Sequence, residues 1–203
     1  ATPPAPELVY LRSSLIPGML EAIDKNYRYF DEFSIFEAAQ VFEKGEYRPS
    51  SEDEVLPVHR NLLAGAIAGK DAKKLFFMVK GAIEGLAGYC HCEPLDFVQK
   101  EKPSWADEKV WLNIVEEGKI IGSFGLISVQ ALTDSGIKLI SAAAFEFDTA
   151  MLEPYPSRTN EFRHLPQYPL VEQDLSLLVD ESMTWGEISE AIKYMVKDLK
   201  RSE

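Results

Sequence analysis

Hydrophobic positions along the chain switch between helical and strand-like spacing. Residues 15–27 carry apolar side chains three and four positions apart, the spacing of an amphipathic helix, and Pro17 fits the first turn of that helix. The stretch "SIFEAAQVFE" at 34–43 has apolar residues on both faces, which predicts a strand covered on both sides. The apolar stretch 59–69 predicts a second strand.

A loop separates these strands, and a helix follows them. The polar, turn-rich stretch 45–55 predicts a loop between them. Asp71 is placed to cap a helix that runs to about residue 89, and Phe76 and Val79 lie on the face of that helix expected to be buried. The sequence therefore predicts two strands followed by one long helix.

A second set of elements completes this part of the chain. Strands at 110–115 and 119–127 are predicted to form a hairpin that turns at "EEGK". A short helix at 128–136 and a strand at 137–148 come next. The order helix, strand, strand, helix, hairpin, helix, strand predicts an α+β domain with a largely antiparallel sheet flanked by helices.

The C-terminal part has its own pattern. Leu175, Leu177 and Val179 alternate as in a strand, and Thr184 with Glu187 forms a capping box at the start of a helix. The inner face of that helix is expected to consist of Ile188, Ile192, Met195 and Leu199. One strand and one helix cannot bury both faces. We therefore expect the remaining apolar surface to pack on the core domain or to make the chain self-associate.

Composition narrows the functional classes. The 203 residues carry a net charge of −12, which argues against DNA or RNA binding by bulk electrostatics. No apolar run approaches the roughly 20 residues of a membrane span, and we expect no signal peptide. Cys90 and Cys92 are too close together for a useful disulfide, so a cytoplasmic location is expected. The ends, "ATPPAPE" and "KDLKRSE", indicate a piece of a longer protein.

Candidate chemistry is sparse. "CHCE" at 90–93 has the residue types of a zinc site, but zinc needs a second ligand pair, and the chain has none. Glu146 and Asp148 lie two apart on one strand and point the same way; such a pair can hold Mg²⁺ or transfer protons, or else face solvent or pair with a cation. Ser13 and Ser14 are candidate helix caps. We therefore predict no catalytic, cofactor-binding or metal-binding set from these residues.

The motif "GSFG" at 122–125 loosely resembles a phosphate-binding glycine loop. It lies inside a strand pattern and not between a strand and a helix. Close backbone packing or a bulge is the better interpretation.

Six stretches in order resemble the C-terminal half of the β subunit of bacterial phenylalanine–tRNA ligase, also called phenylalanyl-tRNA synthetase. They are "LRSSLIPGMLEAIDKN", "IFEAAQVFEKG", "FFMVKGAIEGL", "GSFGLISVQAL", "AAFEFDTAML" and "YPLVEQDLSLLVDE". They are spread over nearly the whole chain, and the last is similar to the opening of the family's ferredoxin-like anticodon-binding domain.

The resemblance implies two domains. Residues 1–159 would form a class II aminoacyl-tRNA synthetase-like core, truncated at its N-terminus, and residues 160–203 would begin the ferredoxin-like domain with a β–α piece. The whole ligase would be a cytoplasmic heterotetramer that attaches phenylalanine to tRNA and uses ATP and Mg²⁺. This segment would be structural, with no cofactor of its own, packing against the catalytic α subunit and leading into a domain that contacts tRNA.

The strand 34–43 bears on that implied role. In an active class II core this strand carries an arginine that holds the α-phosphate of ATP, because a developing anion needs a fixed, bidentate cation. Here it offers Glu37, Gln40 and Glu43 instead. A second arginine expected near 141–152 is also missing, so this core is expected to be non-catalytic.

Specific residues follow from the resemblance. We expect subunit-interface contacts at Leu11, Arg12 and Leu15, and RNA contacts at Arg158, Arg163 and Lys193. The family's Arg–Arg pair before Asp174 is replaced by Glu172–Gln173, which puts RNA contact by that strand in doubt. The alternatives are a regulatory or scaffold protein on a synthetase-like fold, which charges no tRNA, and an α+β hydrolase that uses Glu146 and Asp148.

Overall fold

The computed structural model describes most of the chain. The described residues are 10–43, 48–51, 54–90, 95–116, 118–151, 174 and 176–199. The chain divides into two compact units, residues 1–159 and residues 160–203.

The first unit contains three α-helices, eight strands and a 3₁₀ turn among its described residues. In chain order they are α1 (Ile16–Asn26), β1 (Phe33–Phe42), β2 (Arg48–Ser51), β3 (Glu54–Leu56), β4 (His59–Gly69), α2 (Ala72–Tyr89), β5 (Asp96–Val98), β6 (Ala106–Glu116), β7 (Lys119–Ile127), α3 (Val129–Asp134), β8 (Ser141–Asp148) and η1 (Thr149–Met151). The second unit contributes α4 (Trp185–Leu199). Each described helix is too short or too polar to span a bilayer.

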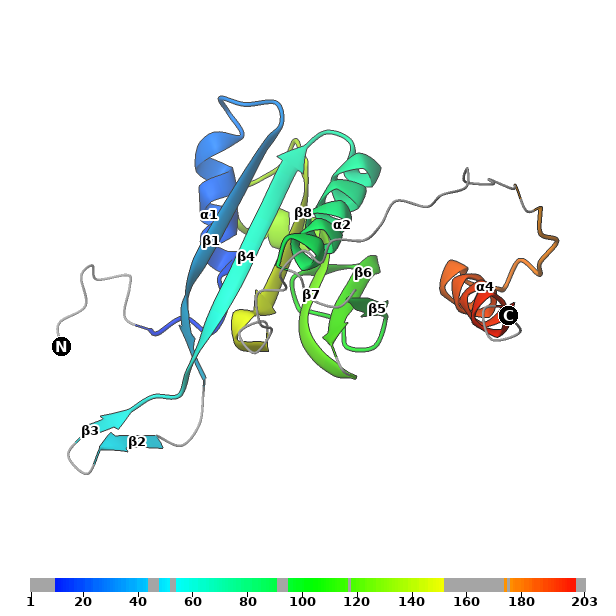
Figure 1. Cartoon of the computed structure of the whole chain (residues 1–203). Helices are drawn as coiled ribbons and strands as arrows, with labels where there is room; N and C mark the ends of the chain where they lie inside the picture. The colour runs from blue at the N-terminus through cyan, green and yellow to red at the C-terminus, as the bar shows by residue number, and fades with distance from the viewer. Residues whose placement is uncertain are drawn as a thin grey trace. The chain divides into compact units, whose positions relative to one another are not determined.

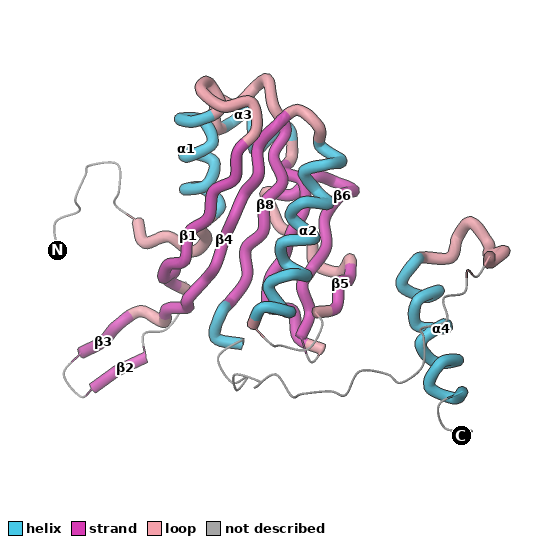
Figure 2. The backbone as a smooth tube through the Cα atoms, turned by 45° about the horizontal axis from the view of Figure 1, so that its top comes forward, coloured by secondary structure: helices cyan, strands magenta, loops and turns pink. Residues whose placement is uncertain are grey.

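Six of the strands form one antiparallel sheet in the order β1-β4-β8-β7-β6-β5. Helix α2 lies on one face of this sheet, and α1 and α3 lie on the other (Figures 1 and 2). Each face has its own buried cluster, one built around α1 and α3 and one around α2. This is the α+β arrangement that the hydrophobic pattern predicts.

Helix α2 shows why these segments fold as they do. The carboxylate of Asp71 accepts a hydrogen bond from the Lys74 N–H at 3.1 Å, so the predicted cap is confirmed. Leu75, Val79 and Ile83, four residues apart, are all buried against the sheet. The spacing of these buried residues thus fixes which face of α2 meets the sheet.

The β6–β7 hairpin is also confirmed. One of its glycines allows the turn, and another allows close packing of neighbouring strands. Gly118 has φ +80° at the turn, a conformation that side chains with a Cβ rarely adopt. A Cβ on Gly122 would lie 2.2 Å from the Cβ of Phe147 on the neighbouring strand. The β6–β7 register shifts between Ile114 and Val115, beside Gly122. "GSFG" is therefore a place of close strand packing next to a bulge.

Two expectations were wrong in this unit, and one strand was missed. Strand β1 is not covered on both sides: Phe36 is 81% exposed, because β1 is the edge strand and α2 lies over β4, β8 and β7. The stretch 45–55 is not simply a loop, because β2 and β3 pair there as a short hairpin. Strand β5 has only three residues, too few to show a pattern in the sequence.

In the second unit, helix α4 and its capping box are confirmed. Glu187 accepts hydrogen bonds from the Thr184 N–H at 2.7 Å and the Thr184 hydroxyl at 2.8 Å. The predicted strand at 175–179 was wrong for its described residues, since 176–180 form no strand. An isolated strand has no backbone partner to hold it extended, and the described part of this unit provides none.

Candidate functional site

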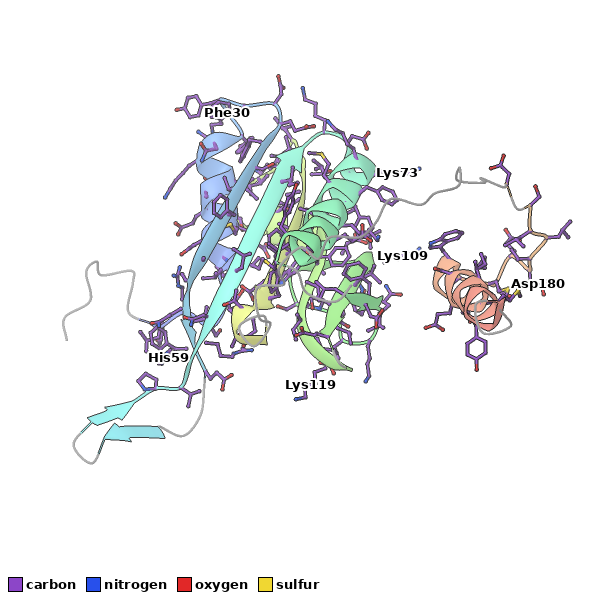
Figure 3. All side chains as sticks on the ribbon, viewed as in Figure 1. Phe30, His59, Lys73, Lys109, Lys119 and Asp180 are labelled. Atoms are coloured by element: carbon purple, nitrogen blue, oxygen red, sulfur yellow. The ribbon has the colours of Figure 1, made fainter. Side chains whose placement is uncertain are left out.

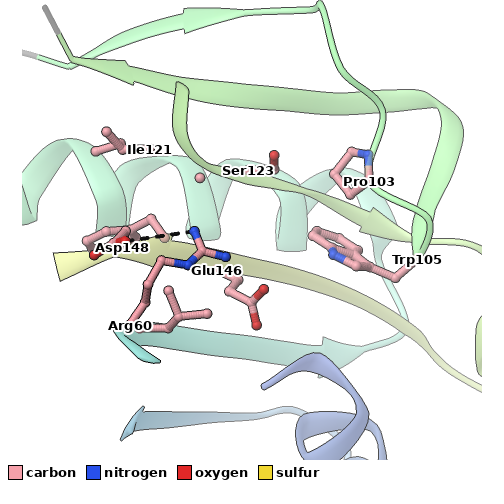
Figure 4. Close-up of a pocket in the computed structure, with 10 residues that line it drawn as sticks. Arg60, Pro103, Trp105, Ile121, Ser123, Glu146 and Asp148 are labelled. Carbon is pink, nitrogen blue, oxygen red and sulfur yellow. Dashed lines mark ion pairs between the residues drawn. The ribbon is translucent and has the colours of Figure 1, made fainter. Parts of the chain in front are cut away.

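A pocket of about 150 Å³ lies on the α1 side of the sheet, where β4, β7 and β8 run side by side (Figure 4). The inward-facing carboxylates of Glu146 and Asp148 come from the end of β8, and Arg60 comes from the start of β4. The lining is completed by Leu62, Pro103, Trp105, Ile121, Gly122, Ser123 and Phe147. Both acidic residues point into the same pocket, as their spacing predicts.

Glu146 holds the beginning of α1. One oxygen of its carboxylate accepts hydrogen bonds from the Ser14 hydroxyl at 2.9 Å and the Leu15 N–H at 2.5 Å. Ser14 also accepts a hydrogen bond from the Ile16 N–H at 3.1 Å. The carboxylate thus satisfies N–H and O–H donors at the positive end of a helix dipole, from a position far away in the sequence.

Asp148 is likewise engaged in the structure. One oxygen accepts a hydrogen bond from the Ala150 N–H at 2.9 Å, and the other lies 3.8 Å from the Arg60 guanidinium. Arg60 also pairs with Glu43 at 2.8 Å. Both carboxylates therefore have structural contacts, Glu146 with the start of α1 and Asp148 with Ala150 and Arg60, and these contacts favour a structural role over a hydrolase built on the pair.

The pocket does not suit ATP. Arg60 is the one cationic side chain among its lining residues, and two carboxylates, Glu43 and Asp148, already surround that guanidinium. Sites for larger organic ligands usually occupy about 300–1,000 Å³, so this volume is also small. A triphosphate would therefore meet net negative charge in too little space.

The loop that forms one wall of the pocket depends on Asn113 of β6. This side chain is 1% exposed and accepts hydrogen bonds from the N–H groups of Lys100 and Glu101. Its amide donates to the Glu101 carbonyl at 2.8 Å and to the Ser123 hydroxyl at 2.9 Å. Asn113 thereby fixes the segment that leads to Pro103 and Trp105.

Sequence reasoning missed Arg60 and Asn113. Asn113 did leave a signal, because it is the one polar residue in the otherwise apolar run "VWLNIV" of a strand. Arg60 left none, since a single arginine at the start of a strand is ordinary.

Strand β1 has no arginine of its own, and the structure shows an arginine from outside the strand in contact with it. Glu37 forms an ion pair with Arg12 at 2.7 Å, and the Nε of Arg12 donates to the Gln40 carbonyl at 3.3 Å. The cation next to β1 therefore comes from the preceding segment and is neutralised by a carboxylate of the strand.

The predicted interface and RNA residues have different surroundings. Leu11 is 63% exposed, and the Arg12 side chain is partly exposed, whereas Leu15 is fully buried in the core of this chain. Leu15 therefore has no surface to offer to another subunit. Arg158 and Arg163 lie outside the described residues, as does the pair 172–173, and Lys193 lies in α4.

Among the described residues, no group of three His, Cys, Asp or Glu side chains is arranged to hold a metal ion. Cys90 is exposed, and the rest of "CHCE" lies outside the described residues.

Comparison with known proteins identifies the family to which the chain belongs. Residues 1–149 match the family described as phenylalanyl tRNA synthetase beta chain CLM domain. The chain belongs to this family. Three phenylalanine–tRNA ligase β subunits illustrate the relationship: that of Bacillus subtilis is 29% identical over 95% of the chain, that of Listeria monocytogenes 28% over 94%, and that of Desulfotalea psychrophila 24% over 94%. The chain spans about a quarter of these relatives, 24%, 24% and 25% of their lengths.

Solved structures confirm the predicted class II-like fold of the CLM domain. Pyrrolysyl-tRNA synthetase from Desulfitobacterium hafniense superposes with a TM-score of 0.55 at 13% identity, over 70% of this chain and 48% of that one. At this identity the likeness concerns the fold alone. The six-stranded antiparallel sheet with its flanking helices is therefore the class II synthetase architecture.

Proposed function

We propose that this chain is a non-catalytic, structural core within the β subunit of a phenylalanine–tRNA ligase. The observation that carries the proposal is a class II sheet whose pocket lacks the charges for ATP. Its one cation, Arg60, is matched by Glu43 and Asp148, and Glu146 is used to hold α1. The architecture of the fold is kept while the electrostatics oppose phosphate binding.

The complete ligase, in this proposal, attaches phenylalanine to tRNA in the cytoplasm with ATP and Mg²⁺, and its α subunit does the chemistry. The matched relatives are phenylalanine–tRNA ligase β subunits, of which this chain spans about a quarter. Their similarity supports assigning the chain to a subunit of that ligase.

The α subunit is proposed to contact the segment before α1. Leu11 is 63% exposed, and Arg12 is held in place by Glu37 and the Gln40 carbonyl, so an apolar and a charged group are presented together. Contact with tRNA is proposed to involve Arg158, Arg163 and Lys193.

The proposal is tested by co-expressing the complete gene product that contains this chain with the α subunit from the same genome. The two are expected to co-purify and to charge tRNA with phenylalanine. Leu11→Asp should weaken the complex about tenfold or more, since it places a charge in an apolar contact. Leu139→Asp is the matched control, because Leu139 is 82% exposed on a different loop.

A chain that purifies without the α subunit and supports no charging would contradict the proposal. That result would favour a regulatory or scaffold protein on a synthetase-like fold. An equal effect of Leu11→Asp and Leu139→Asp would remove the segment before α1 from the interface.

A further inference from the structure

Two carboxylates of the sheet lie in one row on the face that α1 covers. The register pairs Glu37 of β1 with Ala64 of β4, and Ala64 in turn with Glu146 of β8. Side chains directly opposite one another in paired strands point to the same face, and neighbouring strands are about 4.8 Å apart. The backbones of Glu37 and Glu146 are therefore about 10 Å apart, with the fully buried side chain of Ala64 between them.

The chain segment that leads into α1 is attached to both ends of this row. Arg12 forms its ion pair with Glu37 at 2.7 Å. The Ser14 hydroxyl and the Leu15 N–H donate hydrogen bonds to Glu146 at 2.9 Å and 2.5 Å. Since β1 is the first strand of the sheet and β8 is the third, residues 12–15 cross from the edge toward the centre of the sheet.

Backbone contacts define where this crossing lies. The Arg12 carbonyl accepts a hydrogen bond from the Phe42 N–H at 2.8 Å, and the Arg12 Nε donates to the Gln40 carbonyl at 3.3 Å. Phe42 pairs with His59, which marks this end of the sheet, whereas Phe30 lies beyond the opposite end of β1 (Figure 3). The segment therefore crosses the sheet in the half nearer to His59.

Glu146 ties this segment to the sheet and not only to the helix. Ser14 accepts a hydrogen bond from the Ile16 N–H at 3.1 Å, which is a contact within the segment. The Glu146 carboxylate reaches Ser14 and Leu15 from 132 and 131 residues away in the sequence. A local cap fixes the first turn of a helix, whereas a contact from β8 also fixes where that turn lies on the sheet.

Leu11 is joined to the outer end of this segment. It is 63% exposed and lies one residue before Arg12. Its position is therefore set by two attachments, one on β1 and one on β8. Without the attachment on β8, residues 13–15 can shift, and Leu11 can take up several positions relative to the sheet. Ordering such a segment on binding costs free energy, so a segment that is already ordered binds more tightly.

We propose that Glu146 is a positioning residue for the binding of the α subunit, acting through Ser14 and Leu15 on the place of Leu11. The inference rests on the proposed function, because it takes the α subunit as the partner of Leu11. The carboxylate that lines the pocket thereby serves assembly of the ligase. A surface that is in place in only a fraction of the molecules binds with an affinity reduced by that fraction.

The test is the dissociation constant between the complete gene product and the α subunit, measured by titration of the separately purified proteins. Glu146→Ala should raise this constant about tenfold, which corresponds to a segment in place in about a tenth of the molecules. Glu146→Gln should raise it less, because the amide oxygen can accept the same hydrogen bonds. Phe76→Ala is the control: it weakens the packing of α2 on the opposite face of the sheet and should leave the constant unchanged.

A double variant separates positioning from general stability. Leu11→Asp removes the contact whose place Glu146 sets, so adding Glu146→Ala to it should weaken binding by much less than the product of the two single effects. Effects that multiply would show that Glu146 acts independently of Leu11 and would overturn the proposal. A dissociation constant that changes equally in Glu146→Ala and Phe76→Ala would do the same.

Trypsin cleavage after Arg12 adds a measurement on the complete gene product without the α subunit. Glu146→Ala should be cut there faster than the native chain and faster than Phe76→Ala, because residues 13–15 are released from β8. An unchanged rate overturns the proposal. A native chain that does not bind the α subunit contradicts the proposed function and this inference together, whereas native binding that Glu146→Ala leaves unchanged overturns this inference alone.

Discussion

Removing the side chain of Asn113 should lower the free energy of unfolding of the core domain more than removing any of the other hydrogen-bonding side chains near the pocket, because it deletes four hydrogen bonds at once. Asn113→Ala takes away the acceptor for the N–H groups of Lys100 and Glu101 and the donor to the Glu101 carbonyl. The bond to Ser123 is lost as well. Lys100 and Glu101, in the segment before Pro103, then lose their hydrogen bonds to β6.

The magnitude follows from what is left without a partner. A net protein hydrogen bond contributes about 1 kcal/mol, and a buried group without a partner costs about 1–3 kcal/mol. Lys100 and Glu101 are exposed, so water can replace part of the lost bonding at their backbone groups. We therefore expect a loss of about 3 kcal/mol in the free energy of unfolding. Ser123→Ala deletes only one of the four bonds and should cost about 1 kcal/mol.

The assay is urea unfolding of both variants, followed by fluorescence and circular dichroism with the denaturant dependence fitted for each. Limited trypsin digestion adds a local readout, because a loosened segment should be cut faster after Lys100. A loss below about 1 kcal/mol for Asn113→Ala, or a loss equal to that of Ser123→Ala, would refute this reasoning. An unchanged cleavage rate after Lys100 would show that another contact holds the segment.

Three further predictions concern other parts of the chain. Glu146→Ala should cost about 2 kcal/mol in urea unfolding and Glu146→Gln less, because glutamine keeps an acceptor oxygen for the start of α1; equal costs would contradict the anchoring role. Phe76→Ala should cost about 2 kcal/mol, since its partly buried ring stacks on a core phenylalanine at 5.6 Å, while Phe77→Ala should cost under about 1 kcal/mol; similar values would mean that the inner face of α2 is misassigned. Hydrogen bonds from Thr184 lower the pKa of Glu187 below its ordinary value of 4.5. The contribution of this cap to α4 should be present above that value and be lost as the pH falls through the lowered pKa, measured by circular dichroism, and Glu187→Gln should abolish that pH dependence.

Local signals in the sequence predicted those elements whose cause is local. The caps at Asp71 and Thr184 depend on side chains within three residues, so composition and spacing were sufficient. The helical face with Leu75 and Val79 repeats every four residues and needs no tertiary knowledge.

The expectations that failed depended on position in the sheet. The apolar residues of β1 are typical of a strand covered on both sides, but the order of the sheet puts β1 at the edge and leaves Phe36 exposed. Nothing in the strand itself distinguishes these cases. The role of Glu146 was hidden for the same reason, because its partners at Ser14 and Leu15 are more than 130 residues away.

The candidate site was predicted in outline only. The spacing of Glu146 and Asp148 placed both in one pocket, and the missing arginine on β1 was visible in the sequence. The cation that does line the pocket, Arg60, comes from a different strand, and its neutralisation by Glu43 and Asp148 is a tertiary arrangement. Only the structure shows that the charges at the pocket cancel locally.

The most direct test of a class II core without ATP chemistry is calorimetric titration of ATP with Mg²⁺ into the 203-residue chain. We predict no saturable heat at micromolar to low-millimolar ATP, because the guanidinium of Arg60 is already matched by two carboxylates. Arg60→Ala should leave that titration unchanged. Micromolar, Mg²⁺-dependent binding of ATP that is lost in Arg60→Ala would contradict the account.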